Sequence, residues 1–207
     1  TYPLDIVKHI STCQGEYLIT INNAYYRVLN FISQSISEDV VTEPHHAQQA
    51  AFAFGTFTRA LLDFDASSLY PVITDFHNLA MRFEQLNTAI SNATKERLQQ
   101  CKNDIDYCIA QQHLVKELAD VTADLPTRVC HNDTKINNML YCSNTYKAKA
   151  VIDLDTCMAG FLLYDFGDMV RTFCCAEAED SINLEKVVIR KEVFTALVKG
   201  YLAPLKS

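Results

Sequence analysis

Much of this chain repeats apolar residues at the three- and four-residue spacing of amphipathic helices. These stretches cover residues 44–63, 73–92, 94–123 and 191–202, and each predicts helical structure. Pro44 suits the first turn of the first stretch, where the N–H that proline lacks would have no helical partner. The pattern therefore predicts a mostly helical protein.

Strand-like runs are shorter and lie outside these stretches. Residues 16–21 and 25–31 flank Asn22-Asn23, a pair that suits the turn of a β-hairpin. Residues 128–130 and 148–154 predict two further strands on either side of a polar loop. A short β segment followed by long helices, a loop between strands and more helix indicates an α+β fold.

Composition narrows the class of protein. The 207 residues are 49% apolar and carry a net charge of −7, which argues against a nucleic-acid groove because such grooves are basic. No run of eighteen apolar residues predicts a membrane span, and no signal peptide is visible at the start of the chain. The eight cysteines include no C-x-x-C pair, so we expect reduced thiols and a cytoplasmic location.

The polar loop after residue 130 contains the candidate chemistry. His131, Asp133, Lys135 and Asn138 have the spacing H-x-D-x-K-x-x-N of a kinase catalytic loop. Asp133 is predicted to orient an attacking hydroxyl and take its proton, and Lys135 to neutralise the transferring phosphoryl group. Asn138 is predicted to bind Mg²⁺. His131 is interpreted as structural, holding the loop through backbone hydrogen bonds.

Two aspartates close the apolar run that follows. Asp153 stands fifteen residues after Asn138, a separation that allows a hairpin to bring them together. Asp153 and Asp155 would point to the same side of an extended chain. Two neighbouring carboxylates favour a cation between them, so both are predicted to bind Mg²⁺.

A second candidate metal motif lies further along. Residues 165–167 spell Asp-Phe-Gly, the metal-binding motif of protein kinases. They follow Asn138 by twenty-seven residues and have no strand of their own. We therefore assign the metal to Asp153 and predict that Asp165 supports the loop through hydrogen bonds.

Three segments carry a family resemblance: HNDTKINNML, VIDLDT and GFLLYDFGDMVRT. Together they resemble the N-acetylhexosamine 1-kinases, within the aminoglycoside phosphotransferase and choline kinase-like superfamily. The resemblance implies a protein-kinase-like fold in which residues 1–32 are a remnant of the small β lobe with its hinge. Residues 33–207 would then form the helical large lobe.

The resemblance also implies an activity and a set of roles. ATP would give its γ-phosphate to the anomeric hydroxyl of N-acetylglucosamine or N-acetylgalactosamine. Asp133 would be the catalytic base, and Asn138 and Asp153 would bind Mg²⁺ with help from Asp155. The hinge backbone around Asn30, Phe31 and Ser33 would contact the adenine.

The chain departs from the family pattern in one respect that bears on activity. It has five glycines, none of them clustered, and no strand with a matching lysine before residue 16. The family's C-terminal helices also have no counterpart here. We therefore expect this chain by itself to be an incomplete kinase that binds nucleotide weakly and turns over little.

Other interpretations remain open at this stage. The nearest is a kinase of the same superfamily that acts on an aminoglycoside, choline, ethanolamine or homoserine. A non-catalytic, pseudokinase-like binding module would have lost a key carboxylate or amide, yet Asp133, Asn138 and Asp153 are all present. A metal hydrolase would need ligands at a spacing such as H-E-x-x-H, which does not occur.

Overall fold

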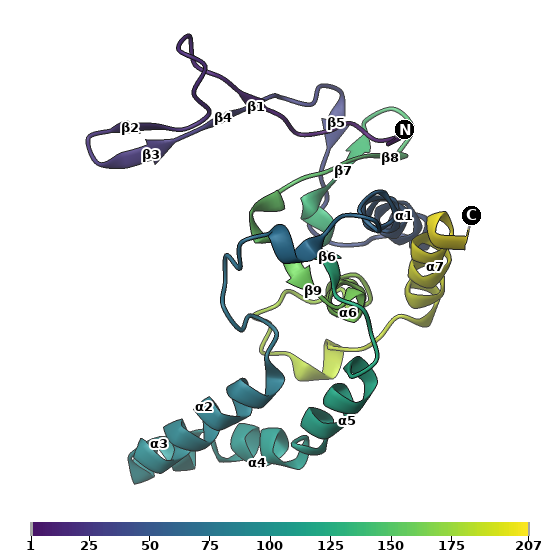
Figure 1. Cartoon of the computed structure of the whole chain (residues 1–207). Coiled ribbons are helices and arrows are strands. Elements are labelled where there is room, and N and C mark those ends of the chain that lie inside the picture. The colour runs from purple at the N-terminus through teal and green to yellow at the C-terminus, as the bar shows by residue number, and fades with distance from the viewer. Residues whose placement is uncertain (1, 207) are drawn as a thin grey trace. The chain divides into compact units, whose positions relative to one another are not determined.

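The computed structural model describes residues 2–206, which divide into two compact units. One unit holds the chain up to Tyr70 and from Arg128 onward, and the other is Pro71–Thr127. Within the described residues there are seven α-helices: α1 (Pro44–Ala60), α2 (Leu79–Asn92), α3 (Lys95–Gln100), α4 (Lys102–Ala110), α5 (His113–Thr122), α6 (Leu162–Phe173) and α7 (Lys191–Leu202) (Figure 1).

The strands form small antiparallel sheets in the first unit. The largest has the order β5-β7-β8, and the other pairs are β1-β4, β2-β3 and β6-β9. Their bounds are β1 (His9–Ile10), β2 (Ile19–Ile21), β3 (Ala24–Tyr26), β4 (Val28–Leu29), β5 (Ser35–Ile36), β6 (Arg128–Cys130), β7 (Met139–Cys142), β8 (Ala148–Val151) and β9 (Met158–Gly160).

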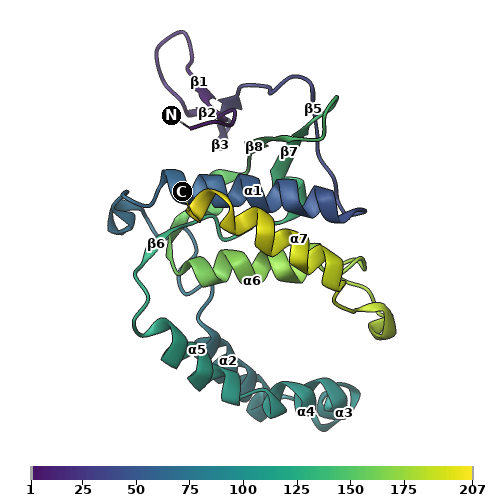
Figure 2. The ribbon, with the colours of Figure 1, turned by 90° about the vertical axis from the view of Figure 1, so that its right-hand side faces the viewer.

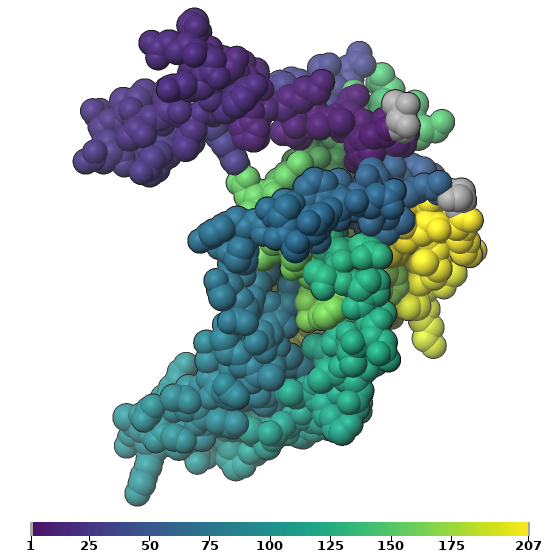
Figure 3. Space-filling model, viewed as in Figure 1, coloured from purple at the N-terminus to yellow at the C-terminus, as the bar shows by residue number. Residues whose placement is uncertain are grey.

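The core of the first unit lies where α1, α6 and α7 pack together (Figure 2). Phe54, Phe173 and Leu197 bring apolar side chains from the three helices into this core and are almost fully buried. Glycine allows the closest approach, because a Cβ on Gly200 of α7 would lie 2.2 Å from the carbonyl oxygen of Gln48 on α1. In the space-filling view, α7 (yellow) lies directly against α1 (blue) (Figure 3).

The three-stranded sheet packs on the same helix. Strands β7 and β8 contact α1. The ring of Tyr141 is fully buried, and its hydroxyl donates to the carbonyl oxygen of His46 at 2.9 Å. The sheet is thereby fixed to α1, so the loop that leads into β7 and the loop that leaves β8 are both attached to a rigid sheet.

The predicted hairpin is confirmed. Strands β2 and β3 pair with Ile21 opposite Ala24, and Asn22 and Asn23 form the turn. Both asparagines have positive φ, 51° and 62°, which is the conformation a two-residue hairpin turn requires. The predicted strand over residues 25–31 is divided in two. Its later part, β4, pairs with β1 and not with β2.

The helices of the second unit are shorter than predicted. The stretch 73–92 becomes helical only at Leu79, where the Asn78 side chain caps the helix by accepting from the N–H of Met81. The stretch 94–123 forms three helices, with breaks at Cys101 and at residues 111–112. None of the residues in α2–α5 is buried, so little packing holds these segments in one continuous helix.

Two expectations from composition can be compared with the structure. Across residues 2–206, no helix is both long and apolar enough to cross a membrane. All eight cysteines are free thiols.

The close contact between α1 and α7 predicts that Gly200→Ala destabilises the protein. The added methyl would collide with the backbone of Gln48, and overpacking of this kind costs about 1–3 kcal/mol. Gly167→Ala is the matched control, since Gly167 is helical and exposed, and a methyl group added there would meet no atom within 4 Å. It should raise the free energy of unfolding by up to about 1 kcal/mol. Urea denaturation measures both, and equal effects would contradict the proposed packing.

Candidate functional site

The candidate loop, residues 131–138, connects β6 to β7 and is held at both ends. β6 pairs with β9, and β7 pairs with β8. The last three residues, Ile136–Asn138, form a short 3-10 turn that leads directly into β7. The two ends of the loop are therefore held by two sheets, independently of the contacts that its side chains make.

A buried carboxylate on α6 anchors the start of the loop. Asp165 is 2% exposed, and its two oxygens accept the backbone N–H groups of His131 and Asn132, each at 2.8 Å. Burial raises the pKa of the Asp165 carboxyl, while the two backbone N–H bonds oppose that rise. This is the contact that the sequence interpretation assigned to Asp165.

Asn132 turns the chain between the anchor and Asp133. Its φ is 65°, a left-handed conformation that asparagine tolerates better than most residues. Its side-chain Nδ2 donates to the carbonyl oxygens of Cys130 and Thr156, at 3.2 and 3.0 Å. The sequence interpretation gave Asn132 no role, although an asparagine at a sharp turn in a polar loop is a recognisable signal.

His131 links the loop to the segment that precedes Asp153. The imidazole is fully buried, and its Nε2 lies 2.9 Å from the carbonyl oxygen of Ile152. Its Nδ1 accepts the N–H of Asp133 at 3.3 Å. These partners place the proton on Nε2 and give His131 the backbone contacts predicted for it.

Thr134 ties the middle of the loop to α6. Its N–H donates to Oδ2 of Asp168 at 2.8 Å, and its hydroxyl donates to the carbonyl oxygen of Asp165 at 2.8 Å. Arg171 in turn donates to the other oxygen of Asp168 at 2.8 and 3.1 Å. Sequence reasoning missed Thr134 and Asp168, because neither belongs to the kinase-like spacing.

Three of the predicted site residues converge in the loop: Asp133 and Lys135 are partly exposed, and Asn138 is buried. The amide Nδ2 of Asn138 donates to the carbonyl oxygen and to Oδ2 of Asp133, both at 2.9 Å. The Lys135 ammonium lies 3.6 Å from Oδ1 of Asp133 and 3.7 Å from a carboxylate oxygen of Glu179. The structure therefore brings Asp133, Lys135 and Asn138 together, and adds Glu179.

The amide of Asn138 has a defined orientation. A carbonyl oxygen can only accept, so the atom facing the Asp133 carbonyl must be the donor Nδ2. The carbonyl Oδ1 of Asn138 then points the other way, and no hydrogen bond reaches it from the residues that the structure describes. An amide oxygen of this kind suits a hard cation such as Mg²⁺.

The backbone around Asp153 differs from the prediction. Strand β8 ends at Val151, Asp153 is left-handed with φ of 57°, and residues 154–156 form a 3-10 turn. The expected alternation of an extended chain is therefore wrong at this point. Asp153 is exposed, and it lines a cavity.

The carboxylate of Asp155 forms an ion pair with an arginine of the same chain. Both of its oxygens accept from the guanidinium of Arg27, with one bond at 2.7 Å. These bonds hold the pKa of the Asp155 carboxyl below its usual range. The premise that Asp153 and Asp155 face one cation from the same side of a strand does not hold.

The cavity that Asp153 lines has a volume of about 580 Å³ and is walled on another side by the predicted hinge. Asn30 and Phe31 line it, whereas Ser33 does not. The carbonyl oxygens of Ser33 and Gln34 accept from the Lys149 ammonium, so Ser33 faces that lysine. The other lining residues are Val7, His9, Arg27, Leu29, Ile32, Ser35, Ile36, Ser37, Leu140, Ile152, Leu154 and Asp155.

Hinge backbone groups remain available in this cavity. Among the described hydrogen bonds, none uses the N–H or carbonyl oxygen of Phe31 or the N–H of Ile32. The carbonyl oxygen of Ile32 accepts from the Ser35 hydroxyl at 2.6 Å. A planar base with one donor and one acceptor edge would find both kinds of partner at Phe31 and Ile32.

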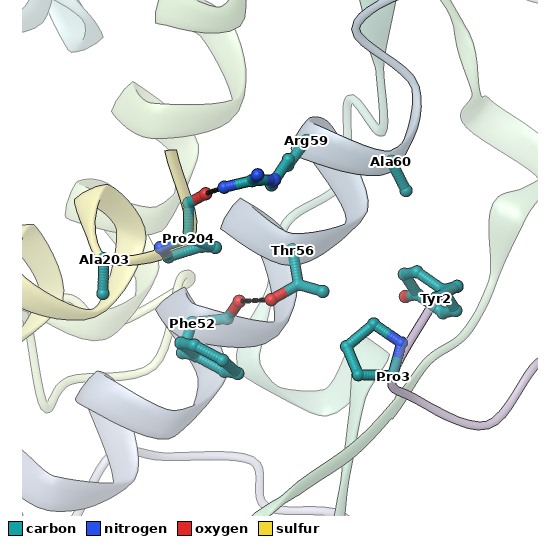
Figure 4. Close-up of a pocket in the computed structure, with 8 residues that line it drawn as sticks. All are labelled: Tyr2, Pro3, Phe52, Thr56, Arg59, Ala60, Ala203 and Pro204. Carbon is teal, nitrogen blue, oxygen red and sulfur yellow. Dashed lines mark hydrogen bonds between the residues drawn. The ribbon is translucent and has the colours of Figure 1, made fainter. Parts of the chain in front are cut away.

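A second cavity, of about 620 Å³, lies beside α1 and contains none of the predicted site residues (Figure 4). Two of its polar side chains, Arg59 and Thr56, bond to backbone carbonyl groups of the chain itself. Arg59 donates to the carbonyl oxygen of Pro204, and the Thr56 hydroxyl donates to that of Phe52. The other walls are Tyr2, Pro3, Ala60 and Ala203, so this cavity offers little chemistry.

The residues present fit Mg²⁺ only in combination with a ligand. In the described part of the chain, no group of three His, Cys, Asp or Glu residues is placed to hold a metal ion. Asn138 and Asp153 supply one amide oxygen and one carboxylate. Mg²⁺ commonly binds through one or two carboxylates plus substrate phosphates, so this sparse donor set is suited to metal that arrives with a nucleotide.

Comparison with known proteins identifies the fold. The family model described as "Phosphotransferase enzyme family" (APH) matches residues 6–188. The structure is similar to an aminoglycoside phosphotransferase from Alicyclobacillus acidocaldarius subsp. acidocaldarius DSM 446, with a TM-score of 0.61 and 17% identity, covering 96% of this chain and 58% of that one. The predicted α+β, protein-kinase-like fold is confirmed.

Two further solved structures have the same fold. A microcompartment-associated aminopropanol kinase has a TM-score of 0.61 and 15% identity, covering 98% of this chain and 60% of that one. The choline kinase from Cryptosporidium parvum Iowa II has a TM-score of 0.50 and 18% identity, covering 92% and 57%. The chain thus spans 57–60% of the length of these three structures.

The Asp165 anchor predicts a specific loss of stability. In Asp165→Asn, one oxygen is replaced by an NH₂ group, so one of the two backbone N–H groups of the loop faces a donor. Leaving a buried N–H without a partner costs about 1–3 kcal/mol of unfolding free energy. Asp106→Asn, on the exposed face of α4, is the matched control and should change stability by less than about 0.5 kcal/mol. Thermal and urea unfolding measure both, and similar values for the two variants would disprove the anchoring role.

Proposed function

The chain belongs to the phosphotransferase enzyme family, and we propose that it forms the core of an ATP-dependent kinase for a small-molecule hydroxyl. One observation carries the proposal. Asp133, Lys135 and Asn138 meet in a loop whose backbone is held by a buried carboxylate. Because the chain spans 57–60% of the solved structures it resembles, the activity is proposed for the full-length protein.

Asp133 and Lys135 have complementary roles in this proposal. The Asp133 side chain is 28% exposed, so an acceptor can reach it, and it would accept the proton of the attacking hydroxyl. The bond from Asn138 holds its carboxylate in one orientation. The Lys135 ammonium, beside it, would balance the negative charge that develops on the transferring phosphoryl group.

Asn138 and Asp153 would hold the metal. The free Oδ1 of Asn138 and the exposed carboxylate of Asp153 are oxygen donors of the kind that Mg²⁺ prefers. When bound there, Mg²⁺ would neutralise negative charge on the nucleotide phosphates. Since Asp155 is paired with Arg27, we assign it no direct part in this pair of ligands.

The hinge would hold the adenine. Asn30, Phe31 and Ile32 form one wall of the cavity that Asp153 also lines, and Phe31 and Ile32 offer free backbone groups. We place the boundary between the small-lobe remnant and the large lobe at residue 32. Because the described residues before 32 contain a single glycine, at 15, a glycine-rich loop over the phosphates is not formed by this segment.

We propose an N-acetylhexosamine, phosphorylated at its anomeric hydroxyl, as the acceptor. The motifs HNDTKINNML and VIDLDT support this choice through their resemblance to hexosamine kinases. Charge supports it as well, because Glu179, whose carboxylate lies 3.7 Å from the Lys135 ammonium, is paired with both Lys135 and Arg171. A neutral sugar suits such surroundings better than the cationic acceptors of aminoglycoside, choline or ethanolamine kinases.

Replacing the proposed base predicts a large kinetic effect. In the full-length protein, Asp133→Asn should reduce the rate of phosphoryl transfer by roughly 10²- to 10⁴-fold, because the proton acceptor is lost. Stability should change little, since the asparagine oxygen can still accept from Asn138. Asp104→Asn on α4 is the control. An unchanged transfer rate in Asp133→Asn would refute the assignment, and it would favour a non-catalytic binding module.

An acceptor screen tests the substrate class separately. With ATP and Mg²⁺, we expect kcat/KM for N-acetylglucosamine or N-acetylgalactosamine to exceed that for kanamycin, choline, ethanolamine and homoserine by about tenfold or more. Coupled measurement of ADP release gives the ratios. Efficient phosphorylation of a cationic acceptor or of homoserine, and of no sugar, would overturn the hexosamine assignment while leaving the kinase assignment intact.

A further inference from the structure

The contact between Arg27 and Asp155 joins two walls of the hinge cavity. Arg27 lies between β3 and β4, just before the hinge, and Asp155 lies in the 3-10 turn that follows Asp153. The two are 128 residues apart in sequence, yet both nitrogens at the tip of the guanidinium donate to both carboxylate oxygens. Both residues also line the cavity, together with Asn30 and Asp153.

Arg27 supplies most of the positive charge in the lining of the hinge cavity. Among the described residues that line it, Arg27 is the one lysine or arginine, while Asp153 and Asp155 are acidic. An adjoining cavity of about 710 Å³ shares Arg27 and His9 with it and adds Lys8. Arg27 and Lys8 thus both line this adjoining cavity.

We propose that Arg27 binds the phosphate groups of the nucleotide, and that Asp155 holds its guanidinium in place until the nucleotide arrives. The inference rests on the proposed kinase function and adds a phosphate-binding residue to it. In the free protein, Asp155 neutralises Arg27. When phosphate oxygens enter the cavity, they replace the Asp155 carboxylate as the acceptor of the two guanidinium N–H groups.

Exchanging the Asp155 carboxylate for phosphate oxygens as the partner of Arg27 is favourable on physical grounds. The Arg27 and Asp155 side chains are 40% and 53% exposed, and an ion pair in water of this kind contributes little stability. A polyphosphate has several negative charges, and it accepts the planar guanidinium fork through two oxygens as a carboxylate does. Breaking the pair therefore costs little compared with the new contacts.

Arg27 has a second possible explanation, in which the ion pair simply fastens the β3–β4 segment to the turn after Asp153. Both explanations predict that loss of Arg27 harms nucleotide binding. They differ in whether the contact itself or the arginine at position 27 is needed. The test must therefore distinguish binding of the phosphates from binding of the base. It must also distinguish a need for arginine at position 27 from a need for the ion pair between positions 27 and 155.

Measuring the affinity of the full-length protein for ATP, ADP and adenosine distinguishes binding of the phosphates from binding of the base. Calorimetric titrations are run with the same excess of Mg²⁺ for the parent and every variant, so that the contribution of the metal at Asn138 and Asp153 is the same throughout. We expect Arg27→Met to weaken ATP binding by about tenfold or more and adenosine binding by less than about twofold, because only ATP presents phosphates. Lys102→Met, which breaks an exposed ion pair on α4, is the control and should change neither.

The charge-swapped variant Arg27→Asp with Asp155→Arg distinguishes a need for arginine at position 27 from a need for the ion pair. It keeps an ion pair between the same two positions and moves the cation to the other wall. We expect its affinity for ATP to stay about as low as that of Arg27→Met. Recovery to the parent affinity would show that an arginine at position 27 is not required and would overturn the proposal. Circular dichroism melting of each variant confirms that it is folded.

The results also separate this inference from the proposed function. If the parent protein binds adenosine and ATP, and Arg27→Met binds ATP as tightly as the parent does, the role of Arg27 is wrong and the kinase proposal stands. If the parent protein binds neither adenosine nor ATP, the nucleotide site itself is wrong, and the inference falls with it.

Discussion

The candidate site depends on one buried carboxylate. Asp165 presents two oxygens to two successive backbone N–H groups at the start of the loop, and without it those groups would be buried with no partner. Placing a carboxylate in an apolar core is costly, and the cost is offset only where hydrogen bonds satisfy it. The core formed by α1, α6 and α7 therefore fixes both the position of Asp165 and the path of residues 131–134.

Around this anchor the loop is divided into a buried half and an exposed half. His131, Asn132 and Thr134 are buried, and each has its polar atoms bonded to backbone or to α6. The side chains of Asp133 and Lys135 remain partly exposed. This division separates the residues that fix the geometry from those that can meet a substrate, which is how a rigid site avoids reorganising during a reaction.

Local spacing in the sequence predicted that Asp133, Lys135 and Asn138 lie close together, and it could not predict most of the contacts that hold the loop. The H-x-D-x-K-x-x-N pattern places Asp133, Lys135 and Asn138 within one short loop, so their proximity follows from chain geometry. The contacts of Thr134 with Asp168, and of Arg27 with Asp155, join residues 34 and 128 positions apart, and only tertiary packing brings them together. Asp153 was expected on an extended strand, and a left-handed residue after β8 redirected the chain.

The central claim is that Asn138 and Asp153 form a magnesium site facing a hinge that holds adenine. A crystal structure of the full-length protein with a non-hydrolysable ATP analogue and Mg²⁺ tests it most directly. We predict a metal at about 2.0–2.1 Å from the Asn138 Oδ1 and an Asp153 oxygen, with the base against Phe31 and Ile32. An analogue bound elsewhere, or a metal with neither residue as a ligand, would contradict it.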